Sequence, residues 1–325
     1  MIRTALTCAT AVVCLGLTAP ASAAGLLQPE PIGAETYAES FTLSIDLGGG
    51  AYLQGQLAVS NLGPGDGQGA CRFLYVPKPG QEVSAAQKFG KDKWRHEAKP
   101  NPKMIVGPCS ITAEASAVRF VAPLDEGRVE VTMKSKAQRV RPPQHDVRVG
   151  SAFYQTEIIV PWSKADVSIT RSGTTQKHSG HGFMDHSRST TLPGKLANRW
   201  VRFRVLDPDH ARLFLVRYPS DGGAPQAWAW SAGEAKPSAV GRVKVGKKPG
   251  GKTPMFRALA MVKGKTWKMT SERLIHRYAP VEKHGMLGAI VGSVVGNPIT
   301  YTYVGKLDQG GKALRGIMEV TLLSE

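Results

Sequence analysis

One stretch of the 325-residue chain concentrates side chains of the types that do chemistry. Between His178 and Thr190 it holds three histidines, one aspartate and one arginine. If this stretch is an extended strand, alternate residues share a face, so His181 and Asp185 lie on the same face, about 13 Å apart. Because that is too far for two ligands of one metal ion, a metal site here would need a sharp bend at Gly180 or Gly182, and we expect none.

Acid–base chemistry needs only one carboxyl group and a partner. An aspartate that faces an apolar cavity has a raised pKa, so it can stay protonated and act as a general acid. We therefore take Asp185 as the candidate catalytic acid, with His181 on the same face to tune or relay its proton. The alternative is structural, with Asp185, the histidines and Arg188 forming a buried network that ties strands or domains together.

A second motif, Gly246 to Thr253, matches the pattern of a phosphate-binding P-loop. A P-loop follows a buried apolar strand and opens a helix. The strand expected before this motif carries Arg242 and Lys244, and an alternating segment follows Pro254. We therefore interpret the motif as a basic β-turn.

A third motif is the apolar run Met286 to Val295, in and beside which Gly288, Gly292 and Gly296 are spaced four apart. Small residues at this spacing allow close helix packing, but the run is too short to span a bilayer. It indicates a buried helix or loop that plugs a barrel end, and a membrane-inserting tip is the alternative.

The elements that must position these residues are mostly strands. Apolar and polar residues alternate in many segments, for example over 41–47 and 201–205. In the second of these, the alternation puts Trp200, Arg202 and Arg204 on the face opposite the apolar residues. With turn signals between them, the segments predict about 14 strands, enough for two antiparallel barrels or sandwiches.

The same alternation recurs near the end of the chain, where Ile317, Glu319 and Thr321 share a face. A helical break is expected only over Ser84–Lys93 and Met286–Val295. The composition agrees with an all-β chain, since 42% of residues are hydrophobic, 21% are charged, and glycine (36) and proline (22) are plentiful. It excludes a coiled coil, a collagen-like chain and a largely disordered one.

The first residues predict export. Met1 to Ala23 combines one basic residue, an apolar stretch and a small-residue site for cleavage near Ala23, as in a signal peptide. We therefore expect a periplasmic or secreted protein. In that oxidising compartment the remaining cysteines, Cys71 and Cys109, are a candidate disulfide, and two separately buried thiols are the alternative.

The chain is strongly basic, with a formal net charge of +17. Its most basic part, 236–283, has Glu272 and Glu282 as its only acids. Outside the cytoplasm such a segment suits an anionic membrane surface or polysaccharide, and we expect no nucleic-acid partner. A merely solubilising surface is the alternative.

The stretch Gly180-His181-Gly182-Phe183-Met184-Asp185-His186 also resembles a known signature, G-x-G-[YF]-x-D-H. This signature belongs to the tandem-lipocalin superfamily, which includes carotenoid 1,2-hydratases (hydroxyneurosporene synthases), AttH-like proteins and yeast survival-factor lipocalins. The strand ending at Val160-Pro161-Trp162 and the segment Trp200–Val205 match their context. The resemblance covers roughly 153–230, and the chain departs from the family's D-H-N-W-G at Ser187-Arg188-Ser189.

The resemblance implies an all-β fold of two consecutive lipocalin-like antiparallel β-barrel domains, which we place at 24–190 and 191–325. It also implies a cavity for a hydrophobic ligand and no cofactor. In the hydratase branch it implies acid-assisted addition of water to an isoprenoid double bond, with Asp185 as the acid. The candidate ligand-binding residues are Phe183, His186, Arg188, Trp200, Trp228 and Trp230.

Two functions of different classes follow. The first is an exported carrier or sensor that binds a lipid or isoprenoid in a barrel cavity without changing it. The second is a cofactor-free hydratase, isomerase or cyclase that uses Asp185 on an isoprenoid-like substrate. A structural or membrane-surface protein with a filled core is a further alternative.

Overall fold

The structure is a computed structural model that describes residues 25–62, 66–207, 209–248, 253–279, 297–311 and 313–323. The expected signal peptide, four residues of the P-loop-like motif (249–252) and the apolar run Met286–Val295 lie outside the described residues. The first three residues of the P-loop-like motif, Gly246 to Lys248, end a β-strand, and no described helix begins at Thr253.

Twelve strands form the first sheet. Their order across the sheet is β4-β3-β2-β1-β12-β11-β9-β8-β7-β6-β5, and β10 pairs with β11. Every pairing in it is antiparallel. The strands are β1 (Ala38–Gly48), β2 (Ala51–Ser60), β3 (Gln68–Lys78), β4 (Gln81–Phe89), β5 (Trp94–Glu97), β6 (Lys103–Val106), β7 (Cys109–Ala113), β8 (Val118–Leu124), β9 (Gly127–Met133), β10 (Asp146–Val149), β11 (Ala152–Arg171) and β12 (Thr174–Ser189).

The first sheet curls so that strands from its two halves meet. The Trp94 indole at the start of β5 donates a hydrogen bond to the carbonyl of Gly67, beside β3 (2.7 Å). A disulfide joins Cys71 on β3 to Cys109 on β7, with their Cα atoms 6.3 Å apart. The expected disulfide is therefore present, and it staples two strands that are distant in the order of the sheet.

Nine strands form the second sheet, in the order β16-β15-β14-β13-β21-β20-β19-β18-β17. A short helix, α1 (Pro193–Leu196), links the two sheets. The strands are β13 (Ala197–Val205), β14 (Arg212–Pro219), β15 (Gln226–Ser231), β16 (Ser238–Ala239), β17 (Val243–Lys248), β18 (Met255–Val262), β19 (Lys265–Tyr278), β20 (Ile299–Asp308) and β21 (Ala313–Leu322).

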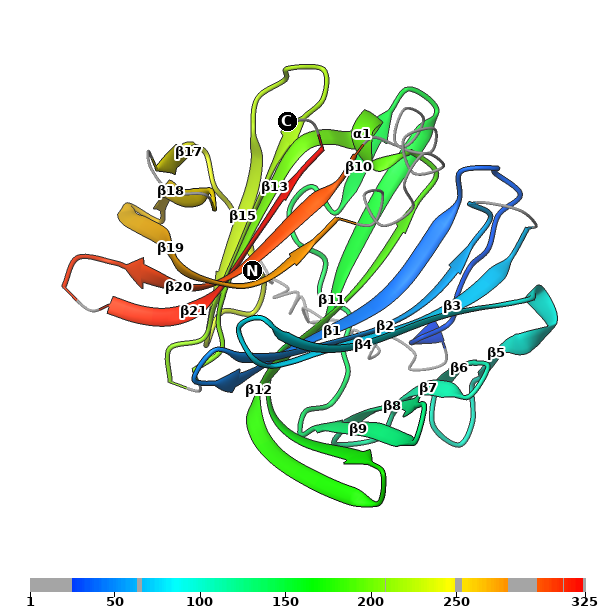
Figure 1. The fold of residues 1–325 in the computed structure, drawn as a ribbon. Helices are drawn as coiled ribbons and strands as arrows, with labels where there is room; N and C mark the ends of the chain where they lie inside the picture. The colour runs from blue at the N-terminus through cyan, green and yellow to red at the C-terminus, as the bar shows by residue number, and fades with distance from the viewer. Residues whose placement is uncertain are drawn as a thin grey trace, which may run out of the picture.

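The molecule is thus almost entirely β, with one nearly closed barrel and one half-barrel, as expected for two lipocalin-like barrels. Figure 1 shows the blue-to-cyan strands of the first sheet beside the yellow-to-red strands of the second. Each sheet encloses its own apolar core.

The exact domain boundary near Thr190 to Leu196 stays a prediction. Among the described residues no helix is long and apolar enough to cross a membrane.

The expected helical break over Ser84–Lys93 is wrong. Most of this segment belongs to β4, and only Lys91–Lys93 makes a short 3-10 turn. Val83 and Phe89, near the two ends of β4, pack against the core of the first sheet, while most of the residues between them are exposed. Pairing with β3 therefore decides the structure, although the small and charged residues of this segment are also good helix formers.

Steric crowding explains why the family-like motif has glycine at positions 180 and 182. A Cβ atom on Gly180 would lie 2.3 Å from the backbone carbonyl oxygen of Asp46, and one on Gly182 would lie 2.5 Å from the Cδ1 atom of Ile45. Both contacts are with β1, the neighbour of β12 in the sheet. The glycines thus let β12 run close against β1, which fixes the position of the residues that follow them.

Candidate functional site

The site lies on β12, whose side chains face the inside of the first barrel on one side and the second sheet on the other. Met184 and His186 face the inside of the first barrel, where Met184 belongs to the core. Phe183 and Asp185 face the second sheet. The alternation of a strand therefore separates the side chains of the motif into two environments.

On the face toward the second sheet, Asp185 is half-buried in a small cavity of about 20 Å³ between the sheets. β11 and β12 supply one wall, and β13, β14 and β15 supply the other. The other lining residues are mostly apolar or aromatic, with two arginines: Tyr154, Thr156, Ile158, Phe183, Arg202, Arg204, Leu213, Phe214, Leu215 and Trp228.

A larger cavity of about 290 Å³ adjoins the small one, and Tyr154 and Arg202 line both. Its wall is largely apolar and includes Leu62, Leu196 and Trp200. The two cavities together form a mainly apolar pocket between the sheets. Asp185 lies at its inner end, as the only carboxylate among the described lining residues of the two cavities.

Burial raises the pKa of Asp185 above its ordinary value. The positive charges of Arg202 and Arg204 oppose this rise, and the negative charge of Glu319 adds to it. No described side chain forms a hydrogen bond or ion pair with the Asp185 carboxyl group, so none of them holds its proton in place. The site therefore combines an aspartate inclined to keep its proton with nearby cations that favour the carboxylate once the proton has left.

A buried ion pair between Arg204 and Glu319 lies next to this site. The Arg204 Nη1 atom donates a hydrogen bond to Glu319 Oε2 (2.8 Å), and the Tyr52 hydroxyl donates one to Glu319 Oε1 (2.9 Å). Tyr52 belongs to the first sheet, so this network joins the two sheets. The Arg204 guanidinium also lies 4.9 Å from the centre of the Phe183 ring. Both carboxylate oxygens of Glu319 are thus already engaged.

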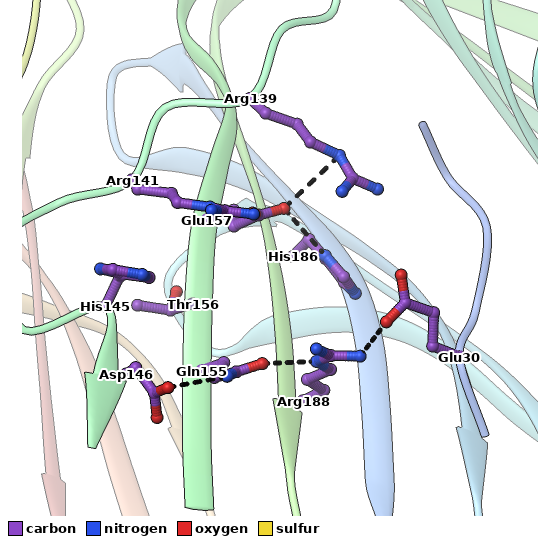
Figure 2. Close-up of a pocket in the computed structure, with 10 residues that line it drawn as sticks. All are labelled: Glu30, Arg139, Arg141, His145, Asp146, Gln155, Thr156, Glu157, His186 and Arg188. Carbon is purple, nitrogen blue, oxygen red and sulfur yellow. Dashed lines mark hydrogen bonds and ion pairs between the residues drawn. The ribbon is translucent and has the colours of Figure 1, made fainter. Parts of the chain in front are cut away.

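The opposite face of β12 borders a polar cavity of about 230 Å³ at the first barrel (Figure 2). His186 lies at its base, where its Nε2 atom is 2.6 Å from Glu39 Oε1 and its Nδ1 atom is 3.7 Å from Glu157 Oε2. Its ring stacks on Phe41, with 4.3 Å between the ring centres. Burial lowers the pKa of His186, but the two glutamates outweigh this and raise it.

Further ion pairs surround His186. Arg141 Nε donates a hydrogen bond to Glu157 Oε1 (2.8 Å), and the Tyr37 hydroxyl donates one to Glu39. Arg188 forms an ion pair with Glu30. These bonds connect β1, β12 and β11 with the segments that flank them. The network has the form of the structural alternative considered for the motif, with His186 and Arg188 as members and Asp185 outside it.

His181, the expected partner of Asp185, lies elsewhere. Its ring stacks on Trp162, with 5.8 Å between ring centres, and it lines a separate groove with Leu206 and Arg315. Among the described residues, Asp185 has no hydrogen bond to His181, His186 or Arg188. The shared face predicted for His181 and Asp185 does not bring them into one cavity.

The expected ligand-binding residues also lie in different cavities. Phe183 and Trp228 line the small cavity with Asp185, and Trp200 lines the larger one. Trp230 packs at the edge of this region and donates a hydrogen bond to the carbonyl of Glu234 (2.9 Å). His186 and Arg188 line the polar cavity on the other face.

Three residues have the spacing of a metal site. Asp207, Asp209 and His210 place potential ligand atoms within 4.8 Å of one another. However, the Asp207 carboxylate already accepts hydrogen bonds from the backbone N–H groups of Asp209 and His210. Because this is the ordinary geometry of a polar turn, it gives no independent sign of a metal.

Sequence reasoning missed Tyr154, Arg202, Arg204 and Glu319 as members of the site. A signal for three of them was present, since alternation placed Arg202 and Arg204 on one face of their strand and Glu319 on one face of its own. The information that was lacking is the pairing of β13 with β21, which sets Arg202 opposite Glu319.

Comparisons with known proteins identify the fold. No family model and no curated protein matches the chain. Among solved structures, a protein described as AttH from Nitrosomonas europaea aligns with a TM-score of 0.62 at 12% identity, over 88% of this chain and 92% of that one.

Two further solved structures agree. Kievitone hydratase from Nectria haematococca aligns with a TM-score of 0.57 at 12% identity, over 92% of each chain. CghA aligns with a TM-score of 0.64 at 13% identity, over 90% of this chain and 89% of that one. The chain therefore has the tandem lipocalin-like fold of these proteins, which confirms the expected fold class.

Proposed function

We propose that the protein is a cofactor-free hydratase, isomerase or cyclase that acts on an isoprenoid-like substrate between its two sheets, with Asp185 as the general acid. The observation that carries the proposal is the place of Asp185, a carboxyl group of raised pKa at the inner end of a mainly apolar pocket. This arrangement supports catalysis more than passive carriage, because binding an apolar chain requires no such group.

The proposed reaction begins when the Asp185 carboxyl group gives its proton to one carbon of a substrate double bond. The other carbon becomes cationic, and the aromatic rings of Phe183 and Trp228 are placed to stabilise it. The charges of Arg202 and Arg204 stabilise the carboxylate that remains.

The cation can be quenched in three ways. Addition of water followed by loss of a proton gives a hydrated product, and loss of a neighbouring proton alone gives an isomer. Attack by a second double bond of the same molecule, followed by loss of a proton, gives a ring. In each case the released proton can return to Asp185, so the cycle balances without a cofactor. A hydratase with this fold, named as such, supports the first route.

Product analysis tests the proposal. The purified protein is incubated with farnesol, farnesoic acid and geranylgeraniol, and the products are separated by liquid chromatography and mass spectrometry. We expect a product with the mass of substrate plus water, or a new isomer of unchanged mass, from wild type and not from Asp185→Asn. Asp166→Asn is the matched control, since Asp166 is exposed on the neighbouring strand β11 and pairs with Lys134.

The rival function is a carrier of a hydrophobic ligand. It would be favoured if wild type binds these compounds and returns them unchanged. Export is a separate proposal, which rests on the composition of Met1 to Ala23 and is consistent with the disulfide between Cys71 and Cys109.

A further inference from the structure

We infer that the substrate carries an acidic head group, such as a carboxylate, and that Arg202 binds this group at the inner end of the pocket. The inference rests on the proposed function, because it names the substrate class for the same site. Three features of the described residues support it: the bonding of Arg202, its position and the local charge.

The first feature is the missing partner of Arg202. Its Nε atom is buried and has no hydrogen-bond partner among the described residues. Glu319 is directly opposite Arg202 in the pairing of β13 with β21, but Tyr52 and Arg204 already occupy its two oxygens. A buried guanidinium donor that lacks an acceptor is costly, so a ligand oxygen at this point would be stabilised.

The second feature is position. Arg202 and Tyr154 line both the small cavity that contains Asp185 and the 290 Å³ cavity beside it. A ligand whose apolar chain fills the larger cavity would therefore bring one end against Arg202. Tyr154 adds a hydroxyl group at the same place, and Trp200 lies farther along the chain's path.

The third feature is the balance of charge. Arg204 and Glu319 neutralise each other as a buried pair. Arg202 has no ion pair of its own within the described part of the chain. When Asp185 holds its proton, Arg202 is therefore the charged residue without an ion-pair partner among the described residues that line the two cavities, and a ligand anion supplies a counter-ion.

The bound anion would also change the charge around Asp185. Its negative charge would favour the protonated carboxyl group before the reaction, and Arg202 would then lie beside both the head group and the carboxylate that forms. The head group also fixes which end of the substrate lies next to Asp185. The double bond that reacts is then one near the acidic end of the molecule.

A pair of ligands with the same chain tests this inference. Farnesoic acid and farnesol share their hydrocarbon chain and differ in the head group. Binding is measured by isothermal titration calorimetry at neutral pH with wild type, Arg202→Gln and Arg199→Gln. Arg199 is the matched control, because it lies on the same strand but stacks on Tyr218 at the other face.

We expect wild type and Arg199→Gln to bind farnesoic acid about 10 to 100 times more tightly than farnesol, as expected for a charge-assisted hydrogen bond. Arg202→Gln should lose this preference, because its affinity for farnesoic acid should fall far more than its affinity for farnesol. Equal affinities of wild type for the two ligands, which require no variant to fold, would overturn the inference, as would a preference that survives in Arg202→Gln.

The outcomes separate this inference from the proposed function. If farnesol and farnesoic acid bind equally and wild type still converts either one, the head-group site is wrong and the enzyme proposal stands. If the acid is preferred through Arg202 but Asp185→Asn turns it over as fast as wild type, the head-group site stands and the role of Asp185 is wrong. If neither ligand binds, both are wrong.

Discussion

Asp185 and His186 are consecutive residues of β12, yet their side chains lie in two different cavities. Asp185 faces the mainly apolar pocket between the sheets, whereas His186 lies between Glu39 and Glu157 beside the polar cavity of the first barrel. The sequence motif thus combines two roles. Asp185 is placed for chemistry, and His186 stabilises the strand that carries Asp185.

Replacing His186 should cost stability. His186→Gln removes the imidazole that lies between two buried glutamates and leaves Glu39 without its closest partner, and loss of one partner of a buried ion pair costs about 3–5 kcal/mol. The free energy of unfolding, measured with denaturant, checks this. His145→Gln is the control, since His145 lines the same cavity but is half-exposed, and it should change stability little. Equal effects of the two substitutions would contradict the structural role.

The same network predicts how stability depends on pH. The interaction with His186, and to a smaller extent that with Arg141, lowers the pKa of Glu157 from 4.5 to about 2. The contribution of Glu157 to the free energy of unfolding is therefore present above pH 4.5 and is lost as the pH falls toward 2. The pKa of His186 is raised above 6.5, so its contribution is complete below pH 6.5 and is lost as the pH rises through the raised value.

Stability attributable to the network should therefore be greatest between these limits. The difference in unfolding free energy between wild type and His186→Gln, measured across the pH range, isolates that contribution. It should shrink at both acidic and alkaline pH. A difference that does not vary with pH would show that His186 is neutral in the folded protein.

Removing the disulfide should destabilise the first barrel. Cys71 and Cys109 are 38 residues apart, and a closed loop of that length stabilises by about 4 kcal/mol in the chain-entropy description. Denaturant unfolding with and without a reductant measures the effect. The double variant Cys71→Ala/Cys109→Ala is the control, and its stability should not respond to reductant. An identical midpoint for wild type in both conditions would contradict the prediction.

The first motif glycine should not tolerate a side chain. Gly180→Ala would push a methyl group against the backbone of Asp46, so β1 or β12 would have to shift, at a typical cost of about 1–3 kcal/mol. The melting temperature checks this. Gly246→Ala on β17 is the control, because a Cβ atom there meets nothing within 4 Å. A wild-type melting temperature for Gly180→Ala would show that the close approach is not needed.

The sequence was sufficient for those features that depend on local pattern. Alternation predicted the strands around Phe41 and Val201, and the even pair of cysteines predicted the bridge. It was insufficient where distant strands meet. Glu39 and Glu157 flank His186 only because β1 and β11 lie on either side of β12.

The expected partnership of Asp185 with His181 illustrates the same limit. Both side chains leave the same face of β12, as predicted, but four residues of an extended strand carry them into different surroundings. His181 meets Trp162, whereas Asp185 meets Arg202 and Tyr154 from other strands. Which partners a strand residue finds is decided by the neighbouring strands and not by its own spacing.

The most direct test of Asp185 as a general acid is solvent-deuterium incorporation. Wild type and Asp185→Asn are each incubated in deuterium oxide with the isoprenoid that wild type converts, and carbon-bound deuterium in the product is measured by mass spectrometry. We predict one carbon-bound deuterium in the wild-type product and a rate about 100- to 10,000-fold lower for Asp185→Asn, with its melting temperature and ligand affinity retained. Equal rates of deuterium incorporation by the two proteins would contradict the account.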